Sequence, residues 1–262
     1  MEAVIKLELN NRTALVCGAS QGIGAATAME LAQLGCSVIA LARSQDKLKQ
    51  LVASLPGTGH RYVCCDLGDR KALEQAITAE LTSGPIHILI NNTAGPKPGP
   101  IAEADEEAFL GAFQNHILVG SLLTRLLLDG MKADGYGRII NIISTSVKQP
   151  IANLGVSNTI RGAMASWSKT LSMEVASFGI TSNNILPGYT TTPRLTSLIE
   201  SAAAKQGKST EAISEQWRNL VPARRFGAPE EVAAAAAFLA SPAASYINGI
   251  NLPVDGGRTG SL

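Results

Sequence analysis

The sequence predicts an α/β fold in which helices cover both faces of a doubly wound parallel sheet. Three observations predict it: short apolar runs alternate with longer amphipathic segments, most of these runs are almost continuously apolar, and a glycine-rich turn follows the first run. Continuous apolar runs are typical of strands buried on both faces, and their alternation with helices implies right-handed βαβ units. Because the chain has 262 residues and no linker, we expect residues 1–262 to form a single domain.

Each expected element follows from the spacing of its apolar residues. The expected strands are 13–17, 37–42, 61–65, 86–90, 138–143 and 180–186. The expected helices are 22–34, 45–55, 69–83, 103–132, 155–178 and 229–240. The last helix has Pro229 in its first turn, followed by two glutamates near the positive end of the helix dipole. Residues 193–222 interrupt the alternation with a polar, helix-prone insertion, which is either a lid over a substrate or a plain surface excursion.

Composition excludes several classes of protein. A formal net charge of +1 provides neither a basic surface for nucleic acid nor an acidic tail. Residues 1–11 hold two glutamates and no long apolar run, so we expect neither a secretion signal nor a membrane span. The four cysteines lack C-x-x-C spacing, and we interpret them as buried, reduced thiols of a cytoplasmic protein, with no metal site.

The turn "CGASQGIG" at 17–24 lies between the first strand and the first helix, the context that a dinucleotide site requires. Gly18 permits the tight turn, Gly22 lets backbone approach a pyrophosphate, and Gly24 lets helix and strand pack closely. The helix start then offers free N–H groups to the phosphates. Glycines also serve plain strand–helix junctions, but we predict a Rossmann-type dinucleotide site. Its predicted residues are Gly18, Ala19, Ser20, Gln21, Gly22, Ile23 and Gly24.

The G-x-x-x-G-x-G spacing resembles the short-chain dehydrogenase/reductase family, and most closely its 3-oxoacyl-acyl-carrier-protein reductase-like members. The resemblance covers nearly the whole chain: "GASQGIG", Asp66, "NNTAG", "GRIINIIS", "PGYTTT" and the C-terminal "GAPEEVAAAAAFLASPAASYINGINLPVDGG". It implies a carbonyl reductase that uses a nicotinamide dinucleotide. It also implies assembly through the alanine-rich last helix and the segment "ASYINGINLPVDGG", so we expect a homotetramer, with a dimer as the alternative.

The end of the second strand favours NADP over NAD. Ala42 stands where an acidic residue would bind the ribose of NAD, and Arg43 beside it suits a 2′-phosphate. A solvated arginine is the alternative, and Gln21 stands where many NADP-binding relatives place a basic residue. Further cofactor contacts implied by the resemblance are Ser44, Asp66, Leu67, Asn91, Asn92, Thr93, Ala94, Pro187, Gly188, Thr190 and Thr192. Thr93 adds a side chain where relatives bring backbone close to the cofactor.

Four positions are expected to carry the chemistry. In the family a serine orients the carbonyl, a tyrosine donates the proton, a lysine assists the tyrosine, and an asparagine positions a water relay. Ser144 matches the serine, but Ser157 and Arg161 occupy the tyrosine and lysine positions, and His116 occupies that of the asparagine. A serine hydroxyl is a poor proton donor, and arginine stays charged at working pH, although Arg161 can still anchor ribose or phosphate.

Two hypotheses follow from these substitutions. The first is a reductase of a small-molecule carbonyl or acyl thioester, in which Ser144 polarises the carbonyl and water or His116 supplies the proton. The second is a catalytically silent NADP-binding scaffold or sensor. Structural roles are the alternative for two of these residues: Ser157 as a hydroxyl on the helix surface, and His116 as a hydrogen-bonded packing residue. Tyr189 and Lys148 are possible substitutes near the site, with cleft lining and solvated surface as their alternative roles.

Overall fold

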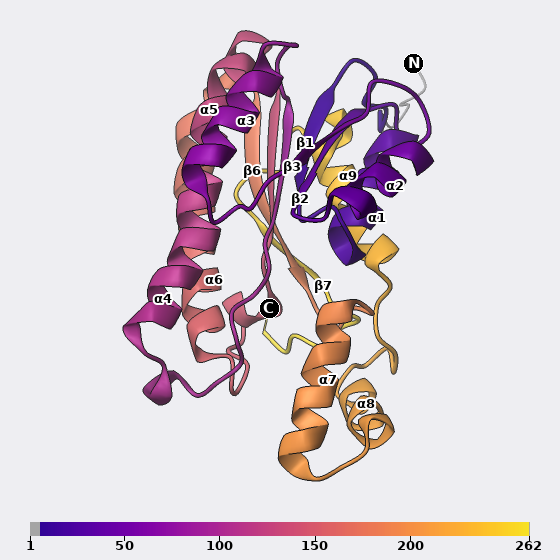
Figure 1. The fold of residues 1–262 in the computed structure, drawn as a ribbon, viewed down its shortest axis with the longest axis vertical. Coiled ribbons are helices and arrows are strands. Elements are labelled where there is room, and N and C mark those ends of the chain that lie inside the picture. The colour runs from indigo at the N-terminus through magenta and orange to yellow at the C-terminus, as the bar shows by residue number, and fades with distance from the viewer. Residues whose placement is uncertain (1–5, 262) are drawn as a thin grey trace.

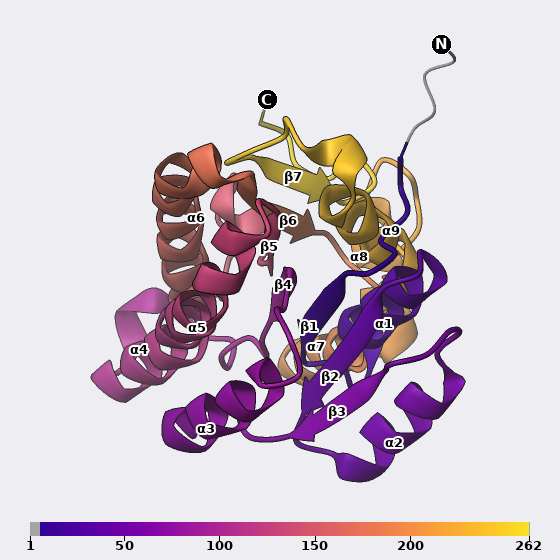
Figure 2. The same ribbon diagram turned by 90° about the horizontal axis from the view of Figure 1, so that it is seen from above.

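A computed structural model describes residues 6–261 and shows a seven-stranded parallel sheet with helices on both faces (Figures 1 and 2). The predicted fold class is therefore confirmed. The strands are β1 Thr13–Cys17, β2 Ser37–Ala42, β3 Arg61–Cys64, β4 Ile88–Asn92, β5 Gly137–Ile142, β6 Ile180–Pro187 and β7 Asn251–Val254. The helices are α1 Gly22–Gln33, α2 Gln45–Ser54, α3 Arg70–Leu81, α4 Glu106–Phe113, α5 Val119–Ala133, α6 Gly155–Val175, α7 Pro193–Gln206, α8 Thr210–Asn219 and α9 Pro229–Ala240.

The strand order places a crevice at the carboxyl ends of β1 and β4. The order is β3-β2-β1-β4-β5-β6-β7, so the chain leaves β1 toward one edge of the sheet and returns beside β1 at β4. Open α/β sheets bind ligands where the strand order reverses in this way. The glycine turn after β1 therefore lies at the position where this fold class holds a nucleotide.

Two apolar layers hold the helices to the sheet. On one face, alternate residues of β1, β2, β4 and β5 pack with α1 and α9, and on the other face the remaining residues of these strands pack with α3 and α5. Figure 2 shows α1, α2 and α9 on one side of the sheet and α3 to α6 on the other. Since both faces are covered, β1, β2 and β4 are mostly apolar, whereas β6 buries polar side chains at residues 181–184.

A row of asparagines crosses four neighbouring strands within the sheet. The strand register aligns Asn91 with Asn141, Asn141 with Asn184, and Asn184 with Asn251. Each side-chain amide donates to the next oxygen: Asn91 to Asn141 at 2.8 Å, Asn141 to Asn184 at 2.9 Å, and Asn184 to Asn251 at 2.9 Å. We call these four residues the asparagine row. Because each buried side-chain amide is hydrogen-bonded, burial of this polar row destabilises the sheet little.

The predicted helix 103–132 differs most from the structure. A short 3-10 turn at Ile101–Glu103 precedes α4, and a π-helical turn at Gln114–Leu118 separates α4 from α5. Apolar periodicity predicts helix throughout this segment, but it does not distinguish a π turn from an α turn. Helix α6 ends three residues before the expected end, in a 3-10 turn at Ala176–Phe178.

The prediction that the cysteines are buried thiols is correct only for Cys17 and Cys36. Cys64 is exposed and Cys65 is half-buried, although all four are free. The apolar run 61–65 predicts a strand covered on both faces, but β3 lies at the edge of the sheet, where its last residues reach solvent. Burial raises the pKa of both Cys17 and Cys36 to about 12, which keeps these two thiols protonated and unreactive.

The insertion at 193–222 forms α7 and α8, which extend away from the carboxyl end of the sheet (Figure 1). These helices have a small core of their own, built from Leu195, Ile199, Ala203 and Ile213. A single parallel bridge between Thr190 and Gly227 closes the base of the segment. No helix in residues 6–261 has both the length and the apolar character needed to cross a lipid bilayer.

Candidate active site

The glycine turn after β1 is packed against the end of β4. Gly18 and Gly22 have φ angles of 62° and 57°, which favour glycine. A Cβ on Gly18 would lie 2.6 Å from the carbonyl oxygen of Asn92, and a Cβ on Gly24 would collide with the carbonyl oxygen of Gly18. The side chain of Asn92 in turn donates to the Cys17 carbonyl at 3.3 Å. Gly18 and Gly24 are therefore required by the close packing of this turn, and the approach of Gly22 to a pyrophosphate stays a prediction.

The start of α1 is open for an anion. Gln21 is the N-cap residue but makes no side-chain hydrogen bond to the helix, and the first turn contains no acidic residue. The N–H groups of this turn, beginning at Gly22 and Ile23, consequently have no side-chain partner. Of the two residues between Gly18 and Gln21, Ala19 is buried and donates its N–H to Leu41, while Ser20 is half-buried.

Cationic and polar groups gather at the carboxyl ends of β2 and β3. Arg43 is exposed and lies 3.8 Å from the carboxylate of Asp66, and Ser44 begins α2 without a side-chain capping bond. Lys47, in the first turns of α2, donates to Gln21 Oε1 at 3.0 Å. Lys47, which was not among the predicted residues, brings a cation to Gln21. The remaining predicted residue here, Leu67, packs its side chain against the apolar layer beside α3.

The residues at the end of β4 and directly after it have different surroundings. Asn91 is buried and belongs to the asparagine row, so its side chain is engaged inside the sheet. Thr93 Oγ1 forms a short hydrogen bond with His116 Nδ1, and its carbonyl accepts from Arg161 at 3.4 Å. Ala94 is exposed. Thr93, which the sequence marks as a departure, thus connects two of the four predicted catalytic positions.

The segment after β6 reaches back to the glycine turn. Pro187 ends β6, and Gly188 lies so near Asp255 that a Cβ would be 2.7 Å from the Asp255 Cα. Thr192 is the N-cap of α7, and its methyl carbon lies 3.1 Å from where a Cβ of Gly22 would stand. Thr190 is buried in the bridge at the base of the lid helices. These residues therefore close the crevice opposite α1.

Ser144 and Ser157 carry the two hydroxyls of the predicted catalytic set. Ser144 follows the end of β5, is half-buried, and accepts the N–H of Ser146 at 3.1 Å. This bond fixes the oxygen and leaves the hydroxyl proton free to donate to a ligand. Ser157 lies in the first turn of α6, half-buried, and within residues 6–261 its hydroxyl makes no hydrogen bond.

Arg161 lies one turn after Ser157 and is buried at the ends of β4 and β5. Its Nη1 donates to the Ile142 carbonyl at 2.8 Å, while its Nε has no partner in the described part of the chain. Burial, and then the charge of Arg194, lower the pKa of Arg161 to about 10. The guanidinium therefore stays positive at neutral pH, in a place largely removed from water.

His116 occupies the π-helical turn between α4 and α5 and is buried. Its Nδ1 bonds to Thr93, and within residues 6–261 its Nε2 has no partner. Burial, and then the charge of Arg161, lower the pKa of His116 to about 2. The imidazole is therefore neutral at working pH and does not donate a proton as an imidazolium. Its unpartnered nitrogen and the π turn are both features that recur at functional sites.

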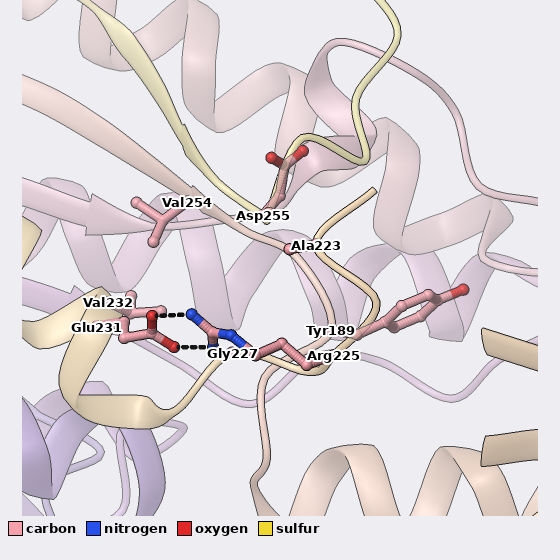
Figure 3. Close-up of a pocket in the computed structure, with 9 residues that line it drawn as sticks. Tyr189, Ala223, Arg225, Gly227, Glu231, Val232, Val254 and Asp255 are labelled. Carbon is pink, nitrogen blue, oxygen red and sulfur yellow. Dashed lines mark hydrogen bonds and ion pairs between the residues drawn. The ribbon is translucent and has the colours of Figure 1, made fainter. Parts of the chain in front are cut away.

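Tyr189 lies before α7 and packs against the small core of α7 and α8. Its ring stacks on Trp217 at 4.9 Å between centroids and meets Phe226 edge-on. Figure 3 shows a small pocket beside it, crossed by the ion pair of Arg225 and Glu231 at 2.6 Å. The pocket is lined by Tyr189, Ala223, Arg225, Gly227, Glu231, Val232, Val254, Asp255 and Gly256. None of the predicted catalytic residues lines this pocket, so it is separate from the crevice.

The described residues contain no group of three or more His, Cys, Asp or Glu side chains that could hold a metal ion. The carboxyl end of the sheet instead carries cations and hydroxyls. Arg43 and Lys47 follow β2, and Ser144, Ser157 and Arg161 follow β5. Such a set can bind anionic groups and polarise a carbonyl oxygen.

Comparison with known proteins matches most of the chain to one family. Residues 18–259 match the family described as Enoyl-(Acyl carrier protein) reductase. The NADPH-dependent reductase BacG of Bacillus subtilis is 33% identical over 261 residues, covering 97% of this chain and 100% of BacG. The 3-oxoacyl-[acyl-carrier-protein] reductase FabG of Vibrio cholerae is 32% identical, covering 96% and 98%. L-sorbose reductase from Gluconobacter frateurii, solved with NADPH and L-sorbose, has a TM-score of 0.91 at 29% identity, covering 98% and 100%.

Proposed function

The chain belongs to the short-chain dehydrogenase/reductase family, and from this membership we propose that it is an NADP-dependent reductase of a carbonyl group. The observation that carries the proposal is that the glycine turn follows β1 and Ser144 follows β5, both at the carboxyl end of the parallel sheet. The substrate that the sequence favours is a small molecule or an acyl thioester such as a 3-oxoacyl thioester.

The relatives confirm the predicted enzyme class and cofactor. BacG is named as NADPH-dependent, FabG as a 3-oxoacyl-[acyl-carrier-protein] reductase, and L-sorbose reductase is described with NADPH bound. A related 3-ketoacyl reductase from Brucella melitensis is described with NADH, which agrees with NAD as the alternative cofactor.

The residues of the crevice fit NADP. Side chains at Gly18 and Gly22 would occupy the turn, and the N–H groups at the start of α1 are free to hold a pyrophosphate. Arg43, Ser44 and Lys47 offer donors for a 2′-phosphate at the end of β2. When bound, the nicotinamide supplies a hydride to the carbonyl carbon.

In the proposed mechanism Ser144 and Arg161 act on the carbonyl oxygen. Ser144, with its oxygen held by the Ser146 N–H, donates its proton in a hydrogen bond to that oxygen. The buried positive charge of Arg161 stabilises the alkoxide that develops. A fixed charge in a site that excludes water is effective because it needs no reorganisation during the reaction.

The proton must come from a group other than the usual phenol. Ser157 is a weak acid, and the imidazole of His116 is neutral, so neither replaces the phenol directly. Water, oriented by the Ser157 hydroxyl and by His116 Nε2, is the proposed donor. General acid catalysis contributes about 10²–10⁴ in rate, so its loss slows the reaction but does not abolish it.

Titration with NADPH and NADH, followed by NADPH oxidation with a short β-keto thioester, tests the proposal. We expect tighter binding of NADPH, and slow turnover that Ser144→Ala reduces at least tenfold, because one donor to the oxyanion is lost. The exposed Ser83→Ala is the matched control and should keep wild-type turnover. An unchanged rate in Ser144→Ala would rule out its role in holding the carbonyl.

A silent NADP-binding scaffold or sensor is the second candidate function. It is favoured by Arg161, whose bonds to the backbone carbonyls of Ile142 and Thr93 resemble a structural role. This function predicts micromolar NADPH binding without oxidation by any carbonyl compound. The double variant Ser157→Tyr, Arg161→Lys would then gain activity if only the acid is missing.

We further propose that the chain forms a single dinucleotide-binding domain, with residues 193–222 as a substrate lid in a cytoplasmic homotetramer. Support for the lid comes from its separate core and from Thr192, the N-cap of its first helix, whose methyl carbon lies 3.1 Å from where a Cβ of Gly22 would stand. Support for assembly comes from exposed apolar side chains on the C-terminal elements, above all Phe238 and Tyr246. A dimer is the alternative assembly.

A further inference from the structure

Two arginines converge at the mouth of the crevice. A Cβ built on Gly95 would lie 3.6 Å from Nη2 of Arg194 and 3.8 Å from Nη2 of Arg161. Arg161 comes from α6 and Arg194 from the first turn of α7, so only the tertiary fold brings them together. The charge of Arg194 also lowers the pKa of Arg161, as a like charge nearby should.

Neither arginine has an anionic partner within residues 6–261. The ion pairs of this part of the chain involve other residues. Arg161 donates only to backbone carbonyls and keeps its buried Nε unpartnered, and Arg194 donates to the Pro96 carbonyl at 2.7 Å. Backbone carbonyls satisfy single N–H groups but leave the two positive charges uncompensated.

The surrounding segments supply no acid to compensate this charge. The first turns of α6 and α7 contain no acidic residue, and the loop 93–100 contains Lys97 but no Asp or Glu. An uncompensated guanidinium that is only 7% exposed is costly unless a ligand neutralises it. The arrangement is therefore suited to an anion that arrives with the cofactor or the substrate.

The position of the pair favours the substrate as the source of the anion. A pyrophosphate is accommodated at the start of α1, next to Gly22 and Thr192. Arg161 instead lies at the ends of β4 and β5, where it bonds the carbonyl of Ile142, two residues before Ser144. An anion between Arg161 and Arg194 thus lies on the side of the crevice where Ser144 would hold the reacting carbonyl.

We propose that Arg161 and Arg194 bind a carboxylate of the substrate, so that the preferred substrates are oxo acids. This inference rests on the proposed reductase function and narrows its substrate class. Two guanidinium groups can hold both oxygens of a carboxylate through charge-assisted hydrogen bonds. Because Arg194 begins α7, the same contact would draw the lid helices over the bound acid.

Steady-state kinetics with matched substrates test the proposal. NADPH oxidation is followed with short 2-oxo and 3-oxo acids, with their methyl esters, and with the corresponding acyl thioesters. We expect kcat/KM for an acid to exceed that for its ester by about ten- to a hundredfold, which is the effect of a lost charge-assisted contact. Equal values for acid and ester, or a preference for the thioester, would overturn it.

The variant Arg194→Gln locates the contact. It should raise KM for the acids about tenfold and leave KM for the esters unchanged. Arg70→Gln is the matched control, because Arg70 is likewise an exposed arginine in the first turn of a helix. A similar loss for acids and esters would mean that Arg194 affects the lid generally and does not bind the carboxylate.

A binding measurement separates this inference from the proposed function. Calorimetric titration of the NADPH-loaded protein with the 3-hydroxy acids, which NADPH cannot reduce, reports the contact without turnover. Binding that weakens about tenfold in Arg194→Gln supports the carboxylate site even if no carbonyl is reduced. If the 3-hydroxy acids do not bind at millimolar concentrations but the protein reduces uncharged carbonyl compounds, the carboxylate site is overturned and the proposed reductase function is retained.

Discussion

Arg161 and His116 give the crevice an unusual electrostatic character. Both are buried, both keep one nitrogen without a partner in the described part of the chain, and Thr93 is bonded to each of them. The charge on Arg161 is one reason why the imidazole is neutral. The two residues therefore act as a unit: the arginine provides fixed charge, and the histidine provides a neutral donor or acceptor.

His116 makes the stability of the protein sensitive to acid. Its pKa is about 2 in the folded protein against 6.5 for the ordinary group, so between these values only the unfolded chain binds the proton. Acid therefore favours unfolding, and the free energy of unfolding falls as the pH drops below 6.5. His116→Gln, which can keep a bond to Thr93, should reduce this loss by about 2 kcal/mol between pH 6.5 and pH 5.

Urea unfolding of the wild-type protein and of His116→Gln at several pH values measures this difference in the free energy of unfolding. Some pH dependence should persist in the variant, because burial also lowers the pKa of His87. If the two proteins lose stability in parallel on acidification, His116 is protonated in the folded state and the neutral role assigned to it is wrong.

Individual residues were predictable from the sequence where their role is local. Gly18, Gly22 and Gly24 are required by the turn itself, so their spacing is sufficient to identify them. Lys47 and Arg194 were missed because their roles depend on tertiary neighbours, Gln21 in one case and Arg161 in the other. No spacing rule connects residues that approach each other from separate helices.

At the scale of elements, the asparagine row ties β4, β5, β6 and β7 together. Asn141 is central, because it accepts from Asn91 and donates to Asn184. All three side chains are almost completely buried, so no water replaces a lost partner. The hydrogen bonds of the row thereby help to fix the register of these four strands.

Asn141→Leu should lower the free energy of unfolding by about 3 kcal/mol, because it leaves a buried donor and a buried acceptor unpaired. Chemical denaturation measures the change. Asn115→Leu is the control for the substitution itself, since Asn115 is exposed and should change stability by less than about 0.5 kcal/mol. A small change in the free energy of unfolding at both positions would show that the asparagine row contributes little to stability.

The six predicted strands and most of the predicted helices lie within a few residues of observed elements, but β7 was not predicted as a strand and one helix contains an unexpected turn. Apolar periodicity determined which face of each element is buried, and this sufficed for β1, β2 and α9, whose bounds match the expected ranges. It did not reveal the π turn at Gln114–Leu118, because one extra residue in a turn barely changes the apolar pattern. That turn positions His116. The prediction of a regular helix here therefore also missed the local conformation of a predicted site residue.

At the scale of the whole molecule, the C-terminal elements bear apolar side chains that the described chain leaves uncovered. Tyr246 is fully exposed at 101%, Phe238 on α9 is 38% exposed, and every residue of the edge strand β7 is only half-buried. Uncovered apolar groups beside an edge strand are characteristic of surfaces that bind another subunit. These residues lie in the segment that the sequence assigns to assembly.

Light scattering coupled to size exclusion should therefore give the mass of four chains. The double variant Phe238→Glu, Tyr246→Ser should dissociate the tetramer to dimers or monomers, because it places charge in an apolar contact. Leu220→Glu, at an exposed apolar residue after α8, is the control and should keep the wild-type mass. A monomeric wild-type protein would contradict the proposed assembly, but it would not bear on the proposed reductase function.

The independence of the lid core has a consequence for how such a protein can acquire new specificities. Leu195, Ile199, Ala203 and Ile213 pack among themselves and with their aromatic neighbours, while the sheet has its own apolar layers. Exchange of residues 193–222 between homologues would thus alter the proposed substrate lid and leave the apolar layers of the sheet in place. Selection can vary this module freely, while the nucleotide half of the molecule remains as it is.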